Sequence, residues 1–140
     1  MKKIIFLIIL SCVLCFKSYA QESVNIKCSN IKGSHNTWKN GRINSMDDGY
    51  SSTTWHFSIP TPVKMGNPLD IRWVGGNSMN VKGVLLWESS DGWVSFVQLH
   101  SQVHRTYTFF YDLGVMTLTE SQTDLLGREP QIKLFFANCN

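Results

Sequence analysis

The sequence lacks the long apolar runs and the glycine-rich loops that mark membrane helices and nucleotide-binding folds. Its longest apolar run, residues 4–16, is shorter than the roughly 20 residues that a membrane-spanning helix needs. The chain contains no Gly-x-Ser-x-Gly nucleophile elbow and no phosphate-binding glycine loop. No segment has the length and the 3.6-residue period of a helix that crosses between parallel strands. These absences leave an all-β chain without a recognisable catalytic motif.

Residues 1–20 have the layout of a secretory signal peptide. Two lysines precede the apolar run, and the small residues Ser18 and Ala20 stand third and first before the expected cleavage site. We therefore expect cleavage after Ala20 and export to the periplasm or the extracellular space. An uncleaved N-terminal anchor and a lipid-anchored form cut before Cys12 are the alternatives. The lack of an Asn-x-Ser/Thr glycosylation site suits a bacterial source.

Without the signal peptide the chain carries no net charge. The full sequence has 13 basic and 10 acidic side chains, and Lys2, Lys3 and Lys17 lie in the expected signal peptide. The ten basic groups that remain balance the ten acidic ones. A balanced chain has no electrostatic footprint for nucleic acid or for an anionic membrane surface. We therefore expect neither as a partner, and no stable membrane insertion after cleavage.

Only two cysteines, Cys28 and Cys139, follow the expected signal peptide. Two cysteines in an exported chain permit one pairing, so we expect a disulfide between the first and last predicted strands. Closing a loop of about a hundred residues is worth roughly 4–5 kcal/mol in the chain-entropy model. Two separate buried thiols are the alternative.

Most of the remaining chain alternates apolar and polar residues with the period of half-buried strands. We count about eight such segments, joined mostly by short turns such as Asp91-Gly92, a strong hairpin signal. Short connections predict an antiparallel sheet, and a bridge between the first and last strands favours a barrel, in which those strands are neighbours. The predicted fold is thus one all-β barrel domain over residues 21–140, with a two-sheet β-sandwich as the alternative.

Residues 29–52 are the exception, because they are rich in Ser, Asn, Gly and charge and show little periodicity. We predict a long irregular loop there, and loops of this length are often functional or disordered. Trp38 and Arg42 lie within it. Trp38 would either plug one end of the barrel or contact a partner. Since aromatic and arginine side chains are enriched at binding hot spots, Trp38 and Arg42 are our first candidate binding residues.

The segment of residues 105–111 is the second candidate site. Its aromatic side chains alternate with threonines, and Phe110 adds an apolar side chain to the opposite face. If one face packs in the core, Phe110 is either covered by the predicted loop or displayed for docking. Arg105, Tyr107 and Phe110 are therefore the second group of candidate binding residues.

No set of residues stands out as a catalytic, metal or cofactor site. His100 and His104 flank a predicted tight turn, but a zinc site uses three or four protein ligands and nothing nearby completes one. Asp47 and Asp48 form an adjacent acidic pair that is typical of a solvated turn. We therefore predict no metal and no cofactor, and we lean against an enzyme.

The favoured function is that of a small exported β-domain protein that binds another protein, in an inhibitor- or immunity-type role. A small-ligand or carbohydrate carrier is the alternative. It would need an empty barrel, whereas Trp55, Trp73 and Trp93 are expected to fill the interior. A small secreted enzyme is the second alternative, and it would need polar groups that converge in space.

Overall fold

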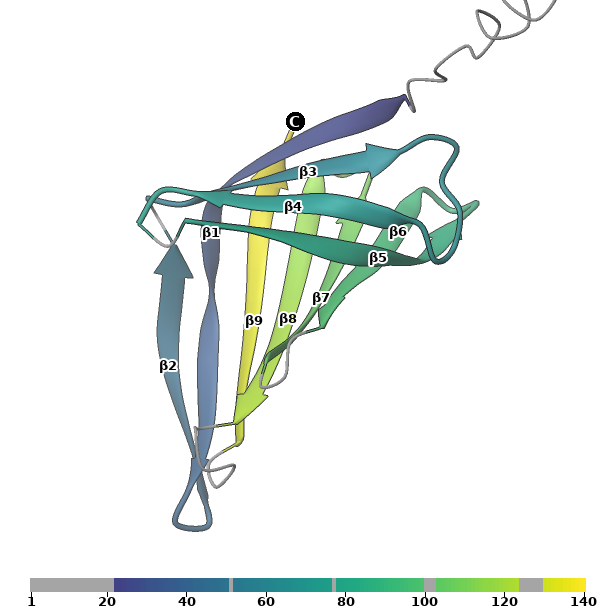
Figure 1. Cartoon of the computed structure of the whole chain (residues 1–140). Coiled ribbons are helices and arrows are strands. Elements are labelled where there is room, and N and C mark those ends of the chain that lie inside the picture. Colours follow the sequence, from purple (N-terminus) through teal and green to yellow (C-terminus); the bar gives the residue numbers. More distant parts are fainter. Residues whose placement is uncertain (1–21, 51, 77, 100–102, 124–129) are drawn as a thin grey trace, which may run out of the picture.

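The computed structural model describes residues 22–50, 52–76, 78–99, 103–123 and 130–140 (Figure 1). The predicted signal peptide lies outside this part of the chain. The described residues form one antiparallel sheet of strands that follow one another along the sequence. The strands are β1 (Ser23–Lys39), β2 (Arg42–Tyr50), β3 (Thr54–Pro60), β4 (Pro68–Val74), β5 (Met79–Ser89), β6 (Trp93–Leu99), β7 (Val103–Phe110), β8 (Val115–Thr123) and β9 (Pro130–Cys139).

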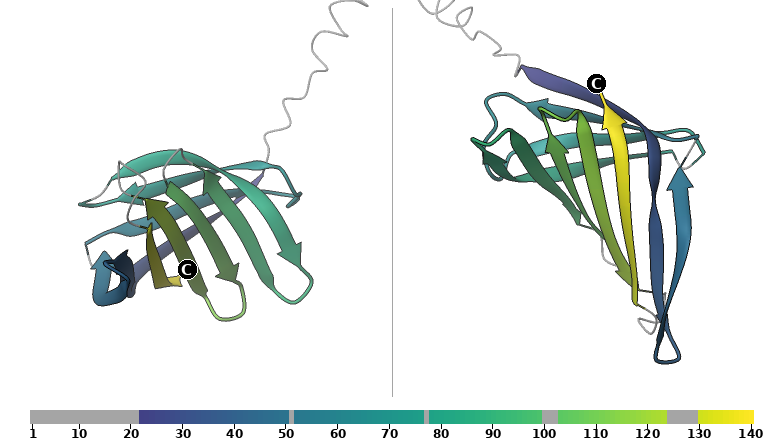
Figure 2. Two further views of the ribbon diagram at one scale, coloured as in Figure 1. Left: turned by 90° about the horizontal axis from the view of Figure 1, so that it is seen from below. Right: turned by 180° about the vertical axis from the view of Figure 1, so that it is seen from behind.

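Strand β1 and strands β3 to β9 close into a barrel. Strand β1 pairs with β3, each of β3 to β8 pairs with the next strand in the chain, and β9 pairs back onto β1. Strand β2 pairs with β1 but lies outside the ring (Figures 1 and 2). The predicted antiparallel barrel is therefore confirmed, and the two-sheet sandwich is not formed.

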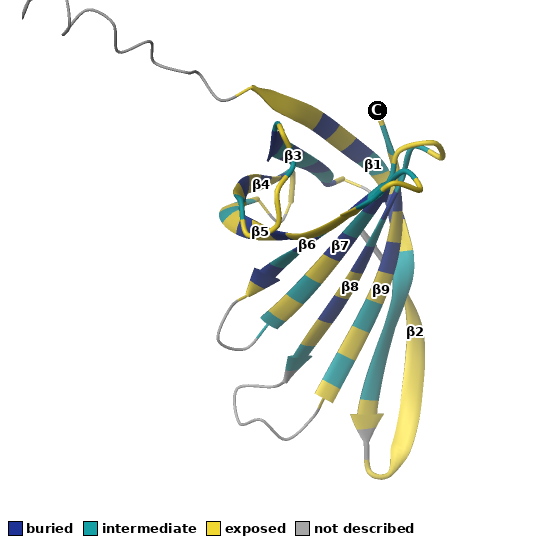
Figure 3. Ribbon diagram, turned by 90° about the vertical axis from the view of Figure 1, so that its right-hand side faces the viewer, coloured by how far each residue is buried: buried dark blue, intermediate teal, exposed yellow. Residues whose placement is uncertain are grey.

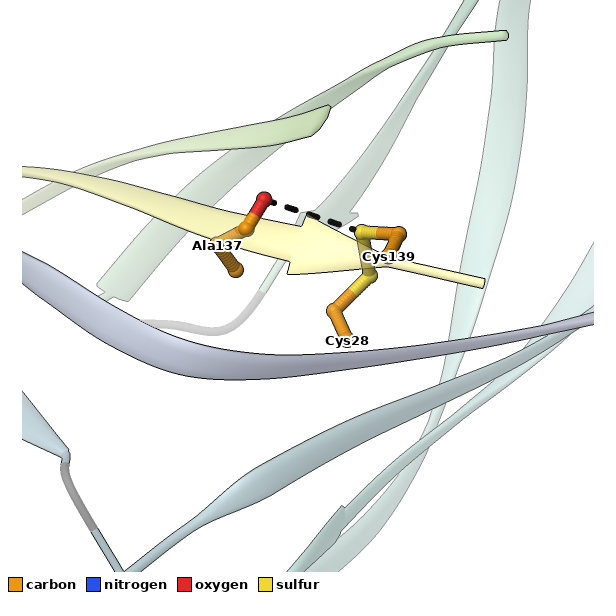
Figure 4. The surroundings of a disulfide bond; sticks show 3 residues. All are labelled: Cys28, Ala137 and Cys139. Atoms are coloured by element: carbon orange, nitrogen blue, oxygen red, sulfur yellow. Dashed lines mark hydrogen bonds between the residues drawn. A yellow bond between two sulfur atoms is a disulfide. The ribbon is translucent and has the colours of Figure 1, made fainter. Parts of the chain in front are cut away.

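Cys28 lies directly opposite Cys139 in the pairing of β1 with β9, and the two form a disulfide (Figure 4). The bridge spans 111 residues of sequence and joins the first strand to the last, as predicted. Beside it, Lys27 and Asn140 exchange two backbone hydrogen bonds, each with an N···O distance of 2.9 Å. The C-terminus is thus fixed to β1 both covalently and by the sheet.

The prediction of an irregular loop over residues 29–52 is wrong. These residues form the second half of β1 and most of a hairpin with β2, in which nine residue pairs stand in register. The turn is Asn40-Gly41, and both residues have positive φ angles, 52° and 74°, as tight hairpin turns of this composition require. The alternation is missing because both faces of this hairpin are exposed or half-exposed, so neither needs a regular apolar pattern.

Strand β1 bends where it changes neighbours. Its residues 23–28 pair with β3, whereas residues 31–39 pair with β2, and the register with β9 shifts between Ser29 and Lys32. Asn30 lies at this irregularity with a φ of 54°. At this bend β1 turns from the direction that it shares with β3 to the direction that it shares with β2 (Figure 1).

Just beyond the bend, β9 approaches β1 so closely that only glycine fits at residue 33. A Cβ on Gly33 would overlap the carbonyl oxygen of Leu134 and lie against Phe135. Because backbone atoms form most of this contact, no rotation of a side chain relieves it. Gly33 therefore allows the barrel to close at this point.

Aromatic rings fill the barrel interior. The buried rings of Trp55, Phe57, Phe96 and Tyr107 contact one another at centroid distances from 5.1 to 6.1 Å. Trp55 and Trp73 are buried, as predicted for them. Trp93 is not in the core, because the alternation of β6 turns Val94 and Phe96 inward and leaves Trp93 half-exposed outside.

Candidate binding surface

Strands β6 to β9, together with the second half of β1 and with β2, extend beyond the layer formed by β3, β4 and β5 (Figures 1 and 3). Along β6 to β9 buried residues alternate with residues that face outward. The two sides of these four strands differ in chemistry, and each is described in turn.

The outward positions of β6 to β9 carry no Asp, Glu, Lys or Arg. They align in rows across the four strands, and the hydroxyls of Ser95 and Thr108, which are neighbours in one row, form a hydrogen bond at 2.8 Å. We name these positions the uncharged face. It consists of Trp93, Ser95, Val97 and Leu99 in β6, His104, Thr106, Thr108 and Phe110 in β7, Val115, Thr117, Thr119 and Ser121 in β8, and Ile132, Leu134, Phe136 and Asn138 in β9.

An apolar stripe runs along β9 within the uncharged face. Ile132, Leu134 and Phe136 occupy consecutive outward positions, and their exposed fractions are 54%, 38% and 51%. Hydroxyl side chains of β8 stand directly opposite them. The stripe is about 14 Å long, at roughly 3.4 Å per residue. Large apolar side chains aligned in this way on a surface are typical of a docking site.

Trp38 extends this stripe onto the hairpin. It follows Asn36 by two positions on the same side of β1, and Asn36 lies opposite Ile132. Trp38 is 49% exposed and pairs with Ile43 of β2, which is also exposed. It therefore does not plug the barrel. Arg42, the other predicted residue of this region, is exposed at the hairpin turn on the opposite face from Trp38.

The second predicted group divides between the two sides of β7. Phe110 faces outward, half-exposed, between Trp93 of β6 and Val115 of β8, so it is displayed rather than covered. Tyr107 is completely buried, and its hydroxyl bonds with Trp73 and Gln98 inside the barrel. Tyr107 therefore cannot contact a partner. The reason is the alternation of the strand, which places Tyr107 on the side opposite Phe110.

The charged side chains of these strands lie on their inner side. Glu120 of β8 is only 1% exposed, and its Oε2 accepts a hydrogen bond from Arg105 Nε at 2.5 Å. Its Oε1 lies 3.5 Å from Lys133 Nζ, and that ammonium lies 3.9 Å from an oxygen of Asp48. The Arg105 guanidinium also lies over the Trp73 ring, 5.1 Å from its centroid. Arg105 thus belongs to this internal network and not to the outer surface.

Uncharged polar side chains continue the network toward the end of the barrel at which β9 begins. Gln131 Oε1 accepts from Gln122 Nε2 at 2.8 Å and lies 3.0 Å from His35 Nε2. The formal charges of Arg105, Lys133, Glu120 and Asp48 cancel. Each of the two carboxylates of the network has a cation beside it, so the network pairs its own charges.

Among the described residues, no group of three or more His, Cys, Asp or Glu side chains can hold a metal ion. His104 is exposed on the uncharged face, whereas His100 lies outside the described residues. Asp47 and Asp48 lie in β2, not in a turn, and Asp48 faces the internal network. No helix in the described ranges has the length and apolar character needed to cross a membrane.

Comparison with protein-family models, with curated proteins and with solved structures finds no match for this chain. Its function therefore has to follow from the residues and their geometry. The most unusual feature of that geometry is the distribution of charge across β6 to β9, where it lies inside and not outside.

Proposed function

We propose that this chain is an exported protein that binds another protein, in the cell envelope or the extracellular space, in an inhibitor- or immunity-type role. The uncharged face supplies the contact surface. The observation that carries the proposal is the absence of Asp, Glu, Lys and Arg from all sixteen outward positions that define this face. The cores of protein interfaces are depleted of charged residues and enriched in aromatic ones in the same way.

The apolar stripe explains how the face would gain affinity. Ile132, Leu134 and Phe136 expose apolar area in a row, and burial of such area contributes roughly 25 cal/mol per Å² before the costs of association are subtracted. Trp38 adds an aromatic side chain beyond the Ile132 end of the stripe. Phe110 adds another toward the Phe136 end, two strands away on β7. The partner should therefore present an uncharged, largely apolar surface of its own.

Two further observations support an exported binding protein. The disulfide between Cys28 and Cys139 suits an oxidising compartment. The interior is filled by aromatic rings, which leaves the apolar part of the barrel without the space that a carried ligand would need. These features favour an external contact surface over an internal ligand site.

The test is capture of a partner by the purified protein from the envelope fraction and the medium of its source, compared with two variants. Leu134→Glu places a charge in the middle of the stripe. Met65→Glu makes the same kind of change at a more exposed apolar residue between β3 and β4, away from the uncharged face. We expect one protein to be captured by the wild type and by Met65→Glu and to be lost with Leu134→Glu.

The captured protein is then purified and its affinity measured at low and high salt. Because the contact carries no charge, the affinity should change little with ionic strength. Capture that Leu134→Glu leaves intact, or an affinity that falls steeply with salt, would show that the uncharged face is not the contact surface.

A further inference from the structure

A row of basic side chains crosses the outer surface of the barrel on strands that take no part in the uncharged face. Lys27 of β1 stands directly opposite His56 of β3, and His56 stands directly opposite Arg72 of β4. Asn80 of β5 continues the row beside Arg72. The neighbours of Lys27, His56 and Arg72 along their strands are buried, so the row faces outward. It spans about 14 Å at roughly 4.8 Å per strand.

These basic groups lack acidic partners. Neither Lys27 nor Arg72 forms an ion pair with a described residue, and the nearest acidic neighbour along β4, Asp70, is bound by Lys82 at 2.5 Å. His56 has only Thr54 Oγ1 near its Nε2, at 3.0 Å. Lys27 and Arg72 lie on either side of His56, and neither charge is balanced by a carboxylate among the described residues. A bound anion would supply the balancing negative charge.

The row borders a pocket. A surface pocket of about 440 Å³ lies over Lys27, His56 and Arg72. The remaining residues that line it are Asn25, Ile26, Phe57, Ser58, Asp70 and Asn80. Cavities of roughly 300–1,000 Å³ are typical of sites for small molecules. The size of the pocket favours a small ligand over the broad contact that a macromolecule would make.

We propose that this pocket binds the anionic group of a small polar ligand, a carboxylate or a phosphate, between Lys27, His56 and Arg72. The guanidinium of Arg72 can hold two oxygens of such a group at once, and the ammonium of Lys27 supplies a second charge. The amide and hydroxyl groups of Asn25, Ser58 and Asn80 can bond with neutral hydroxyls of the same ligand. The site is independent of the protein-binding role, because it lies on other strands.

The test is a titration of the purified protein with inorganic phosphate and, separately, with acetate, at an ionic strength held constant with chloride. Backbone and histidine NMR signals report where each anion binds. We expect chemical-shift changes only at the residues around the row. The anion that binds more tightly identifies the ligand's acidic group. Lys27→Gln and Arg72→Gln should each weaken binding about tenfold, because each removes a charge-assisted contact.

Lys64→Gln is the matched control, since it removes one exposed positive charge between β3 and β4 and outside the pocket. It should leave the affinity unchanged. The melting temperatures of Lys27→Gln and Arg72→Gln should not fall, because neither side chain forms an ion pair with a described residue, and this shows that lost binding is not lost folding. Equal weakening by Lys64→Gln, or shifts at every basic residue, would overturn the proposal in favour of non-specific ion screening.

A third arm uses vesicles of phosphatidylglycerol and phosphatidylcholine in a sedimentation assay. Binding to the anionic vesicles, with no response to phosphate or acetate, would assign the row to a membrane surface and would overturn the small-ligand proposal. Failure to sediment, together with a localised response to one of the free anions, supports it.

Discussion

Arg105 Nε donates a 2.5 Å hydrogen bond to Glu120 Oε2 across the inner side of β7 and β8, while the outer side of both strands carries no charge. The inner side of these strands is otherwise mostly buried and apolar, so the charged network is a polar region within the barrel core. Its paired charges hold neighbouring strands together from within, while the outer side of the same strands carries none.

Glu120→Gln should lower the free energy of unfolding by about 3–5 kcal/mol. The change leaves Arg105 and Lys133 without their shared carboxylate in a position that is 1% exposed. Urea denaturation followed by tryptophan fluorescence measures the loss. Asp70→Asn is the control, because it breaks the exposed ion pair with Lys82 and should cost about 1 kcal/mol or less. Equal costs for the two variants would show that the network does not stabilise the barrel.

Trp38→Ala should leave the free energy of unfolding within about 0.5 kcal/mol of the wild type, because Trp38 is half-exposed on the hairpin. It should weaken partner binding by at least about tenfold if Trp38 is a binding hot spot. Trp55→Ala, in contrast, should destabilise the protein by about 3–5 kcal/mol, because Trp55 is fully buried. A large loss of stability with Trp38→Ala would mean that the hairpin packs on the barrel more tightly than its exposure indicates.

Two kinds of signal in the sequence favour the barrel. Alternation is a local signal and predicts the strands, whereas the pairing of Cys28 with Cys139, which are 111 residues apart, is a long-range signal that joins the first strand to the last. The hairpin of β1 and β2 was missed because exposure of both its faces removes the periodic signal. One signal did exist, since Asn40-Gly41 is a typical two-residue hairpin turn.

The surfaces were harder to predict, because each depends on register between strands. The sequence shows that Tyr107 and Phe110 face opposite sides of β7, but not which side is buried. Lys27, His56 and Arg72 are 16 or more residues apart, and they become a row only through the pairing of β1, β3 and β4. The uncharged face likewise exists only once β6 to β9 are aligned.

Gly33→Ala should destabilise the protein by about 1–3 kcal/mol or more, because the added methyl group overlaps the β9 backbone. Thermal unfolding gives the measurement. Gly41→Ala is a useful comparison, since its Cβ would meet nothing and its cost, about 1 kcal/mol, comes only from the positive φ of 74°. If Gly33→Ala were as mild as Gly41→Ala, β1 and β9 would have to be able to separate locally.

The pKa of His56 should lie below its ordinary value of 6.5, first because of desolvation by burial and then because of the positive charges of Lys27 and Arg72. The unfolded chain then binds more protons than the folded one between the two pKa values. Stability therefore rises as the pH increases through that window, and the contribution of His56 is lost as the pH falls through its folded pKa. An NMR titration of the imidazole gives the pKa directly.

Lys27→Gln should raise the pKa of His56 toward its ordinary value, since it removes one of the two facing charges. Lys64→Gln should leave it where it is. An unchanged His56 pKa in the Lys27→Gln variant would mean that Lys27 takes no part in the shift, which would leave burial and Arg72 as its causes.

Replacing both cysteines, as Cys28→Ser with Cys139→Ser, should lower the free energy of unfolding by about 5 kcal/mol, because the bridge closes a loop of 111 residues in the unfolded chain. The double variant avoids a lone thiol that can pair between molecules. The folded barrel should persist, since the pairing of β1 with β9 and the two hydrogen bonds between Lys27 and Asn140 hold the ends without the bridge. Reductant should lower the melting temperature of the wild type to that of the variant and leave the variant unaffected. Equal melting temperatures for the oxidised wild type and the variant would mean that the sheet alone restrains the ends, and that the disulfide adds nothing to the closure of the barrel.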